Sequence, residues 1–367
     1  MKMKSLLVAA AVAASGMVLA AEPAAGEVSA EKPRVRIVAT TFPIYDWTRE
    51  VLGEKLAETD LVLLQQSGVD LHSYSPSAAD LRSVAACDLF VFVGGESDEW
   101  TERALAQKGN PRRRVLNLVK TLGPAAKEEK VVEGMEHEHH HEHAEKHDHD
   151  EDHDHDHAKK HDHDEDHDHD HAKKHDHDED DNHDEDHDEH EIDEHVWLSL
   201  RHAATLVKAI AAELAVVDPA NAATYSANAA AYCKRLAALD RDYAAAVKGA
   251  KRKTILVADR FPFRYLADDY GLAYFAAFAG CSAESEASFK TVAFLAKKVD
   301  ELKLPVILTM EGARHKIAET VRRTTKSGGQ RILTLDSLQS TDGKSARTAR
   351  YLDVMAKNLA VLKEALN

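Results

Sequence analysis

Histidine and carboxylate side chains, which proteins use to bind transition metals, are concentrated in one segment of this chain. Twenty of the 24 histidines lie between His137 and His190. In the same segment the 14-residue unit KHDHDEDHDHDHAK occurs twice without a change, at 146–159 and 160–173. The histidines of the two copies are candidates for auxiliary, weak metal sites: His147, His149, His153, His155, His157, His161, His163, His167, His169 and His171.

The repeat is poorly suited to a single well-defined metal site. Alternate residues of an extended chain lie about 7 Å apart, so neighbouring imidazoles could share a metal ion in many equivalent ways. The only apolar residues of the segment are three alanines, so it cannot bury enough surface to offset the entropy lost on ordering. We expect residues 136–191 to form a disordered insert that gathers, senses or stores metal.

The charge of the chain is distributed unevenly. Residues 136–194 contain 29 acidic residues and 5 lysines, whereas the whole chain has a net charge of −17. The remainder is therefore slightly basic, and the 44% of hydrophobic residues is enough for globular cores. A strongly acidic segment repels phosphate, which argues against nucleic acid as a partner.

Only four histidines lie in sequence that is expected to fold, and a specific site needs ligands on rigid elements. His72 lies in the turn-rich stretch GVDLHSYSPSAADL, and His195 lies in DEHVWLSL at the start of a helix. His202 and His315 have basic neighbours, so we expect them at the surface. A single histidine in a loop is more often a surface residue than a ligand, so residue type alone leaves both interpretations open for His72.

Short apolar runs alternate with helical patterns on both sides of the insert. This alternation is typical of parallel sheets covered by helices on both faces. The stretch 218–249 starts with Asp-Pro and reaches its first glycine at Gly249, which predicts one long helix; two shorter helices are the alternative. The predicted strands lie within 35–47, 61–64, 87–96, 115–119, 254–258, 272–278, 305–310 and 331–335.

We therefore predict an α/β fold with two Rossmann-like lobes joined by one long rigid helix. The N-terminal lobe covers 34–217 and contains the insert, the bridging helix covers 218–249, and the C-terminal lobe covers 250–367.

Residues 1–20 have the charged start, short apolar run and small residues that are typical of a signal peptide cleaved near Ala20. Residues 21–33 are expected to form a flexible leader. No cysteine follows the apolar run, so we expect a periplasmic protein that is not lipid-anchored, and we expect a monomer.

Three cysteines, Cys87, Cys233 and Cys281, allow one disulfide in an oxidising compartment, and their spacing does not choose the pair. No Cys-x-x-Cys occurs, so neither a thiolate zinc site nor a redox motif is expected.

Acidic residues follow three predicted strands of the C-terminal lobe, namely Asp259, Glu311 and Asp336. In open α/β sheets, ligands bind beyond the carboxyl ends of the strands. Three acids at three strand ends therefore point to one edge of a cleft, although any one of them could instead be a turn former or a helix cap.

Several motifs resemble those of the ABC-transporter solute-binding proteins for zinc and manganese (cluster A-I). GVDLHSYSPSAAD resembles that family's first metal-ligand loop, DEHVWLSL its second histidine motif, and LTLDSL its C-terminal aspartate motif. LVADRFPFRYLADDYGL occupies the place of its third ligand, and LTMEGARHKIAETV matches a strand followed by a glutamate. The resemblance covers nearly the whole mature chain, and the His-rich insert is the mark of the zinc-uptake, ZnuA-like branch.

The resemblance implies a metal cleft between the lobes, with His72 and His195 from the first lobe and Asp336 from the second. The chain departs from the family at one point, because zinc members usually have a third histidine where this sequence reads Ala-Asp-Arg. We take Asp259 as the substitute ligand and keep three further acids in reserve: Glu311, Glu284 and Glu286.

Two imidazoles with carboxylates suit Zn(II) and also Mn(II), so the cleft ligands do not decide the metal. The many imidazoles of the insert favour Zn(II), with Mn(II) as the alternative. The resemblance implies capture of Zn(II) and delivery to an ABC transporter membrane permease, without catalysis. A periplasmic zinc buffer or store that works through the insert is the alternative; a zinc hydrolase has little support, because HEIDEH is one residue longer than HExxH.

Overall fold

The computed structural model describes residues 34–135, 191–282, 286–312 and 314–367. The predicted signal peptide and leader, the His-rich insert up to residue 190, and Glu284 therefore lie outside the described residues. Residues 35–367 form one compact unit. None of the described helices is both long and apolar enough to cross a membrane.

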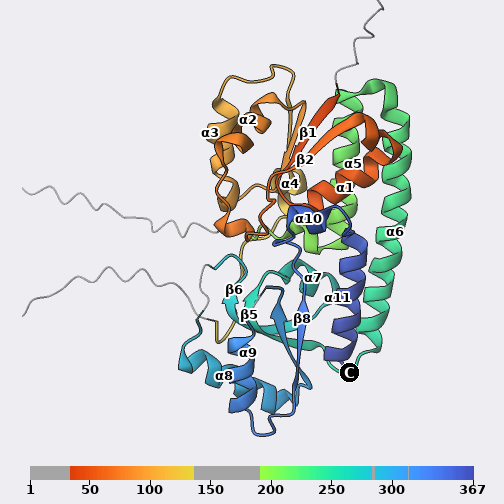
Figure 1. Cartoon of the computed structure of the whole chain (residues 1–367). Coiled ribbons are helices and arrows are strands. Elements are labelled where there is room, and N and C mark those ends of the chain that lie inside the picture. Colours follow the sequence, from red (N-terminus) through yellow and green to blue (C-terminus); the bar gives the residue numbers. More distant parts are fainter. Residues whose placement is uncertain (1–33, 136–190, 283–285, 313) are drawn as a thin grey trace, which may run out of the picture. The chain divides into compact units, whose positions relative to one another are not determined.

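Two four-stranded parallel sheets form the framework of this unit (Figure 1). The first has the strand order β2-β1-β3-β4 and the second has the equivalent order β6-β5-β7-β8. All eight predicted strands are present, so the predicted pair of parallel α/β sheets is confirmed. The strands are β1 (Val35–Ala39), β2 (Thr59–Leu63), β3 (Leu89–Phe92), β4 (Arg114–Asn117), β5 (Thr254–Phe261), β6 (Ala273–Ala279), β7 (Val306–Met310) and β8 (Arg331–Leu335).

Helices cover both faces of each sheet, as parallel strands require. They are α1 (Phe42–Leu52), α2 (Ala78–Ala86), α3 (Trp100–Ala106), α4 (Leu118–Leu122), α5 (Leu200–Val217), α6 (Ala222–Gly249), α7 (Arg264–Tyr270), α8 (Phe289–Leu302), α9 (Lys316–Thr324), α10 (Gly343–Ala346) and α11 (Tyr351–Ala365).

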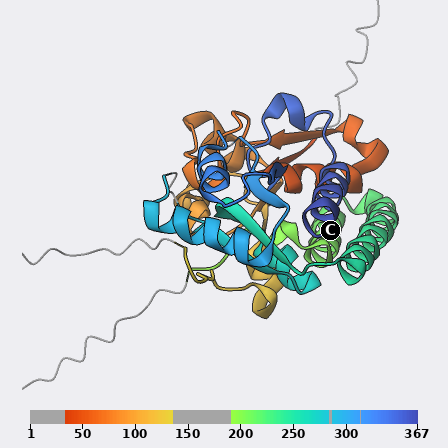
Figure 2. The same ribbon diagram turned by 90° about the horizontal axis from the view of Figure 1, so that it is seen from below.

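Successive residues of the central strands point to opposite faces, and each face has its own apolar partners. In the first sheet, Ile37 belongs to the main core with α1 and α5, whereas Val38 belongs to a smaller core with α2 and α3. In the second sheet, Val257 belongs to the main core, whereas Leu256 packs with α8 and α9. Figure 2 shows the second sheet between α8 on one side and α11 on the other.

The long helix α6 runs as one continuous 28-residue element after a single 3-10 turn at Pro219–Asn221, so the alternative of two shorter helices is wrong. It packs against α5 and α1 beside the first sheet and against α11 and α7 beside the second (Figure 1). The main core continues through these helices from one sheet to the other. The exact lobe boundaries stay a prediction.

One strand extends further than its sequence pattern predicts. β5 continues to Phe261, with an irregular register between Val257 and Arg260 in its pairing with β6. Asp259 therefore lies within the strand, at this irregularity, and not after the strand as expected. The polar pair Asp-Arg interrupts the apolar pattern and hides the continuation.

A buried ion pair fastens α1 to the C-terminal end of the chain. Arg49 pairs with Asp46 and also donates to the carbonyl oxygen of Ala346 at 2.9 Å and to that of Ala349 at 2.6 Å. The second oxygen of Asp46 accepts from the backbone N–H of Tyr351 at 2.7 Å. Each charge thus has several partners, so the loss of one would leave the others unpaired.

We expect Arg49→Ala to lower the free energy of unfolding by about 3–5 kcal/mol, because it leaves the Asp46 carboxylate buried without its counter-ion. Urea unfolding monitored by circular dichroism measures this. Arg36→Ala is the matched control, since Arg36 forms a solvent-exposed pair with Asp60 that is worth about 0–1 kcal/mol. Equal losses in the two variants would contradict the assignment.

Candidate metal centre

His72 lies in the loop after β2, on the 3-10 turn Leu71–Ser73. The side chain of Asp70 caps this turn by accepting from the backbone N–H of His72 at 3.1 Å. The ring Nδ1 of His72 lies 2.8 Å from the hydroxyl of Ser97, in the turn after β3. These two contacts fix the ring and direct its other nitrogen, Nε2, away from the loop.

His195 is fully buried directly before the 3-10 turn Val196–Leu198. Asp193 accepts from both its backbone N–H and its ring Nδ1, each at 2.9 Å. A proton on Nδ1 is favoured by this carboxylate, and it leaves the Nε2 lone pair free. A carboxylate behind an imidazole is the usual arrangement that orients a histidine toward a metal.

The segment that contains His195 is held by residues from the second half of the chain. Trp197 donates from its indole N–H to the carbonyl oxygen of Ser337 at 2.7 Å, and its own carbonyl oxygen accepts from the hydroxyl of Tyr351 at 2.6 Å. The hydroxyl of Tyr265 donates to the carbonyl oxygen of Asp193 at 2.9 Å. These hydrogen bonds therefore fix the segment of His195 to residues of the second half of the chain.

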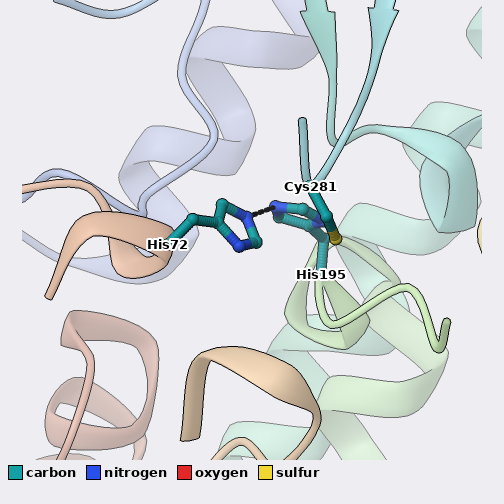
Figure 3. Close-up of side chains that lie close together, drawn as sticks. All are labelled: His72, His195 and Cys281. Atoms are coloured by element: carbon teal, nitrogen blue, oxygen red, sulfur yellow. Dashed lines mark hydrogen bonds between the residues drawn. The ribbon is translucent and has the colours of Figure 1, made fainter. Parts of the chain in front are cut away.

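Cys281 completes a group of three metal-ligating side chains (Figure 3). It follows the end of β6, and its Sγ atom and one nitrogen from each of His72 and His195 all lie within 4.8 Å of one another. Figure 3 shows the two rings facing each other with the thiol beside His195. Among the described residues, no other histidine, cysteine, aspartate or glutamate joins this group.

The backbone at Cys281 is also fixed. The carboxylate of Glu129 accepts from the N–H groups of Gly280 and Cys281, the latter at 3.1 Å. A Cβ atom at Gly280 would lie 2.9 Å from the carbonyl oxygen of Phe261, so only glycine allows the ends of β5 and β6 to approach this closely. Both features set the place of the thiol.

The spacing of the two imidazoles suits a shared ion. Nε2 of His72 and Nε2 of His195 lie 3.2 Å apart. Two nitrogen ligands of a tetrahedral zinc with Zn–N distances of about 2.0–2.1 Å are about 3.3 Å apart. The amide oxygen of Gln339, a further acceptor, lies 3.0 Å from Nε2 of His195. The two imidazole nitrogens and the amide oxygen of Gln339 point their lone pairs at one another, and they share one proton at most. A metal cation would satisfy these lone pairs better.

Burial and neighbouring charges shift the pKa values of the groups around the centre. Burial raises the pKa of Glu194 to about 7, and burial together with the charges of Glu129, Asp193 and Glu194 raises the pKa of the Cys281 thiol. Burial and the neighbouring His195 lower the pKa of His72 to about 3. Burial also acts to lower the pKa of His195, but the hydrogen bond and charge of Asp193 outweigh it and raise that pKa.

Asp336 and Glu311, which the sequence predicted near the metal, accept hydrogen bonds from other groups. Asp336 follows β8, but its carboxylate accepts from the backbone N–H of Leu338 at 2.8 Å. Glu311 follows β7 and binds both the backbone N–H and the hydroxyl of Ser337. Burial raises the pKa of Glu311 to about 7, helped by the charge of Asp336. These two acids lie near each other, outside the group of His72, His195 and Cys281.

The two other predicted acids that the structure describes, Asp259 and Glu286, do not join the group either. Asp259 is half-buried and accepts from the backbone N–H of Arg260 at 2.9 Å, and Glu286 is exposed. The two other described histidines are half-buried rather than exposed as expected: His202 packs its ring on Tyr265, and His315 bonds to Thr309.

Cys281 is the site residue that sequence reasoning missed. The absence of a Cys-x-x-Cys motif argued against a thiolate site, yet all three cysteines are free and one of them lies beside both histidines. The signal was present, because Cys281 follows the predicted strand 272–278 directly after Ala279 and Gly280. The strand-end rule that selected the acids also selects this cysteine.

A family model described as "ZnuA: Zinc-uptake complex component A periplasmic" matches residues 37–365. The zinc-binding protein AdcA of Streptococcus pyogenes serotype M3 is 29% identical over 331 residues, which cover 90% of this chain and 56% of that protein. The high-affinity zinc uptake system protein ZnuA of Bacillus subtilis is 28% identical over 341 residues, which cover 93% of this chain and 90% of that protein. The chain thus spans little more than half the length of the streptococcal relatives, and two pneumococcal relatives are named lipoproteins.

Solved structures share the fold. The Zn(II)-bound ZnuA-like domain of Streptococcus pneumoniae AdcA has a TM-score of 0.62 and 25% sequence identity, and the match covers 91% of this chain and 99% of that one. The metal-dependent lipoprotein YcdH of Bacillus subtilis has a TM-score of 0.64 and 24% identity, with the same coverage of 91% and 99%.

The raised pKa of His195 predicts a proton-coupled affinity for a divalent cation. Below that pKa a proton must leave Nε2 before a metal can bind, so His195 should make affinity fall by about tenfold per pH unit there and should add no pH dependence above it. Because Asp193 raises this pKa, the fall in Asp193→Asn should begin at a lower pH. Calorimetric titrations in buffers of different ionisation enthalpy measure the proton release. An unchanged pH profile in Asp193→Asn would refute the role of that carboxylate.

Proposed function

The chain belongs to the ZnuA family of periplasmic zinc-uptake components, and on that premise we propose that it captures Zn(II) and delivers it to an ABC-type membrane permease. The observation that carries the proposal is the pair of imidazole nitrogens of His72 and His195, 3.2 Å apart. They come from separate, rigid segments of the chain and face each other without a bridging side chain. One ion between them needs no further rearrangement of either ring.

Zn(II) is the proposed cargo, with Mn(II) as the less favoured alternative. Imidazole nitrogens suit zinc, whereas manganese favours oxygen ligands. The relatives named above are described as zinc-binding or zinc-uptake proteins. Capture and delivery require only reversible binding, so no catalytic group is assigned.

We propose further that the His-rich insert is an auxiliary element that gathers zinc for the centre. The segments that flank the insert are joined, because Glu128 pairs with Ile192 in an antiparallel bridge and the N–H of Asp193 donates to the carbonyl oxygen of Lys127 at 2.8 Å. This bridge lies three residues from His195 in sequence, and Glu129 next to it accepts from the backbone N–H of Cys281. Ions bound by the insert would therefore be released near the centre.

Export to the periplasm, cleavage near Ala20, the absence of a lipid anchor and a monomeric state remain predictions. The proposed lobes, 34–217 and 250–367 with the bridging helix 218–249, also remain part of the proposal. Two pneumococcal relatives are named lipoproteins, so the predicted absence of a lipid anchor needs a test. Mass spectrometry of the exported protein would show an attached lipid directly.

Replacing residues 137–190 by a short Gly-Ser linker should leave one tight Zn(II) site and remove the weaker ones. The expectation follows because His72, His195 and the Glu128–Ile192 bridge all lie outside the deletion. Competition with a chromophoric chelator measures affinity and stoichiometry. Loss of all tight binding would favour the alternative, a zinc buffer that works through the insert.

In the same deletion background, His72→Ala and His195→Ala should each lower the Zn(II) affinity of the tight site. Loss of a residue that only orients a ligand lowers metal affinity by about 10–100-fold, and loss of a ligand should lower it further. His202→Ala is the matched control, since His202 is a half-buried histidine that lies outside the centre. Comparable losses in all three variants would indicate a general effect on folding and would count against the site.

A further inference from the structure

We propose that the thiolate of Cys281 is the third protein ligand of the metal, so that the centre is a two-histidine, one-cysteine site. This rests on the proposed function and names the ligand set of that same site. Three donor atoms from His72, His195 and Cys281 lie within 4.8 Å of one another. The family's third histidine is expected near Asp259. In this proposal a cysteine after another strand, β6, takes its place.

The two sheets supply the outer ligands from equivalent places. β2 and β6 are the corresponding edge strands of their sheets, since the strand orders are β2-β1-β3-β4 and β6-β5-β7-β8. His72 lies in the loop after β2, and Cys281 lies two residues after the end of β6. Both therefore lie at the carboxyl ends of parallel strands, where α/β folds bind their ligands.

Arg260 braces the two loops that contain these outer ligands. Its guanidinium pairs with Asp70, whose other oxygen holds the backbone of His72. It also donates to the carbonyl oxygen of Ser282, next to Cys281, at 3.2 Å. One side chain thus fixes the spacing between the loop of His72 and the loop of Cys281. Such outer contacts are what orient the ligands of a metal centre.

The alternatives for a third ligand are weaker on geometry. The carboxylate of Asp336 accepts from the backbone N–H of Leu338 and lies outside the group of three donors. Asp259 accepts from its own neighbour Arg260. Gln339 does face His195 at 3.0 Å, but its amide nitrogen donates to Asp70, so it holds this loop as well. The thiol of Cys281 is the available donor that lies beside both imidazoles.

A thiolate changes what the centre selects. Two nitrogens and one sulfur form a soft to borderline donor set that suits Zn(II) and Co(II) and disfavours Mn(II), which prefers oxygen. The sulfur ligand would then add to the preference for zinc that the two imidazoles give. Replacing the sulfur by a carboxylate in Cys281→Asp should narrow the preference for Zn(II) over Mn(II).

The direct test uses the full chain with one equivalent of Co(II). A thiolate bound to Co(II) gives a charge-transfer absorption in the near ultraviolet, whereas imidazole and carboxylate ligands do not. The His-rich insert contains no cysteine, so cobalt bound there does not contribute to this band. We expect the band in the wild-type protein, its loss in Cys281→Ser and its retention in Cys233→Ser. Cys233 is the matched control, a half-buried free thiol that bonds to the carbonyl oxygen of Ala204.

Cys281→Ser should also weaken the tight Zn(II) site by about 100-fold or more, beyond the loss of an outer partner. Zinc should slow the alkylation of Cys281 in the wild-type protein by N-ethylmaleimide, read by peptide mass spectrometry, without slowing that of Cys233. This measurement needs no variant and therefore holds even if Cys281→Ser folds poorly.

The outcomes separate the two proposals. A wild-type protein without the charge-transfer band, or a band that persists in Cys281→Ser, overturns the thiolate ligand. If His72→Ala and His195→Ala abolish tight binding while Cys281→Ser changes neither affinity nor spectrum, only the thiolate ligand fails. If the two histidine variants leave tight binding intact, the proposed function fails at this centre.

Discussion

The buried imidazole of His195 is the point on which the arrangement depends. Asp193 fixes its orientation from behind, and Trp197 and Tyr265 tie its segment to the second half of the chain. A fully buried ring whose free nitrogen faces another imidazole is unfavourable unless a proton or a metal lies between them. The fold thus holds two imidazole nitrogens so close that they must share a proton or a cation, which is the physical basis for affinity toward a divalent cation.

Two sheets of the same strand order are placed so that their carboxyl edges contribute to one centre. The first sheet contributes the loop of His72 and the second contributes Cys281, while α6 and the continuous main core make residues 35–367 one compact unit. Arg260, Asp70 and Gln339 connect the loops directly around the centre. Small relative movements of the two sheets would therefore change the distances between the ligands, which suits a protein that must bind an ion and later release it.

The sequence predicted the framework well because parallel strands that are buried on both faces leave continuous apolar runs, as in TILVA and VILTM. It also named His72 and His195 as candidate metal ligands, because their motifs resemble those of a known family. It missed the end of β5, because Asp259 and Arg260 interrupt the apolar run, and it passed over Cys281, because a single cysteine without a second one nearby has no recognisable spacing. Which strand ends meet depends on contacts such as those of Glu129 and Arg260, which are distant in sequence and leave no local pattern.

X-ray absorption at the zinc edge of the full chain, loaded with one equivalent of Zn(II), tests the central claim most directly. We predict nitrogen scatterers at about 2.0–2.1 Å and one sulfur scatterer at about 2.3 Å. The sulfur contribution would show that the ion lies at the centre of His72, His195 and Cys281, since the insert has no sulfur ligand. A first shell of nitrogen and oxygen alone, unchanged when His72 and His195 are replaced by alanine, would place the ion in the insert and contradict the account.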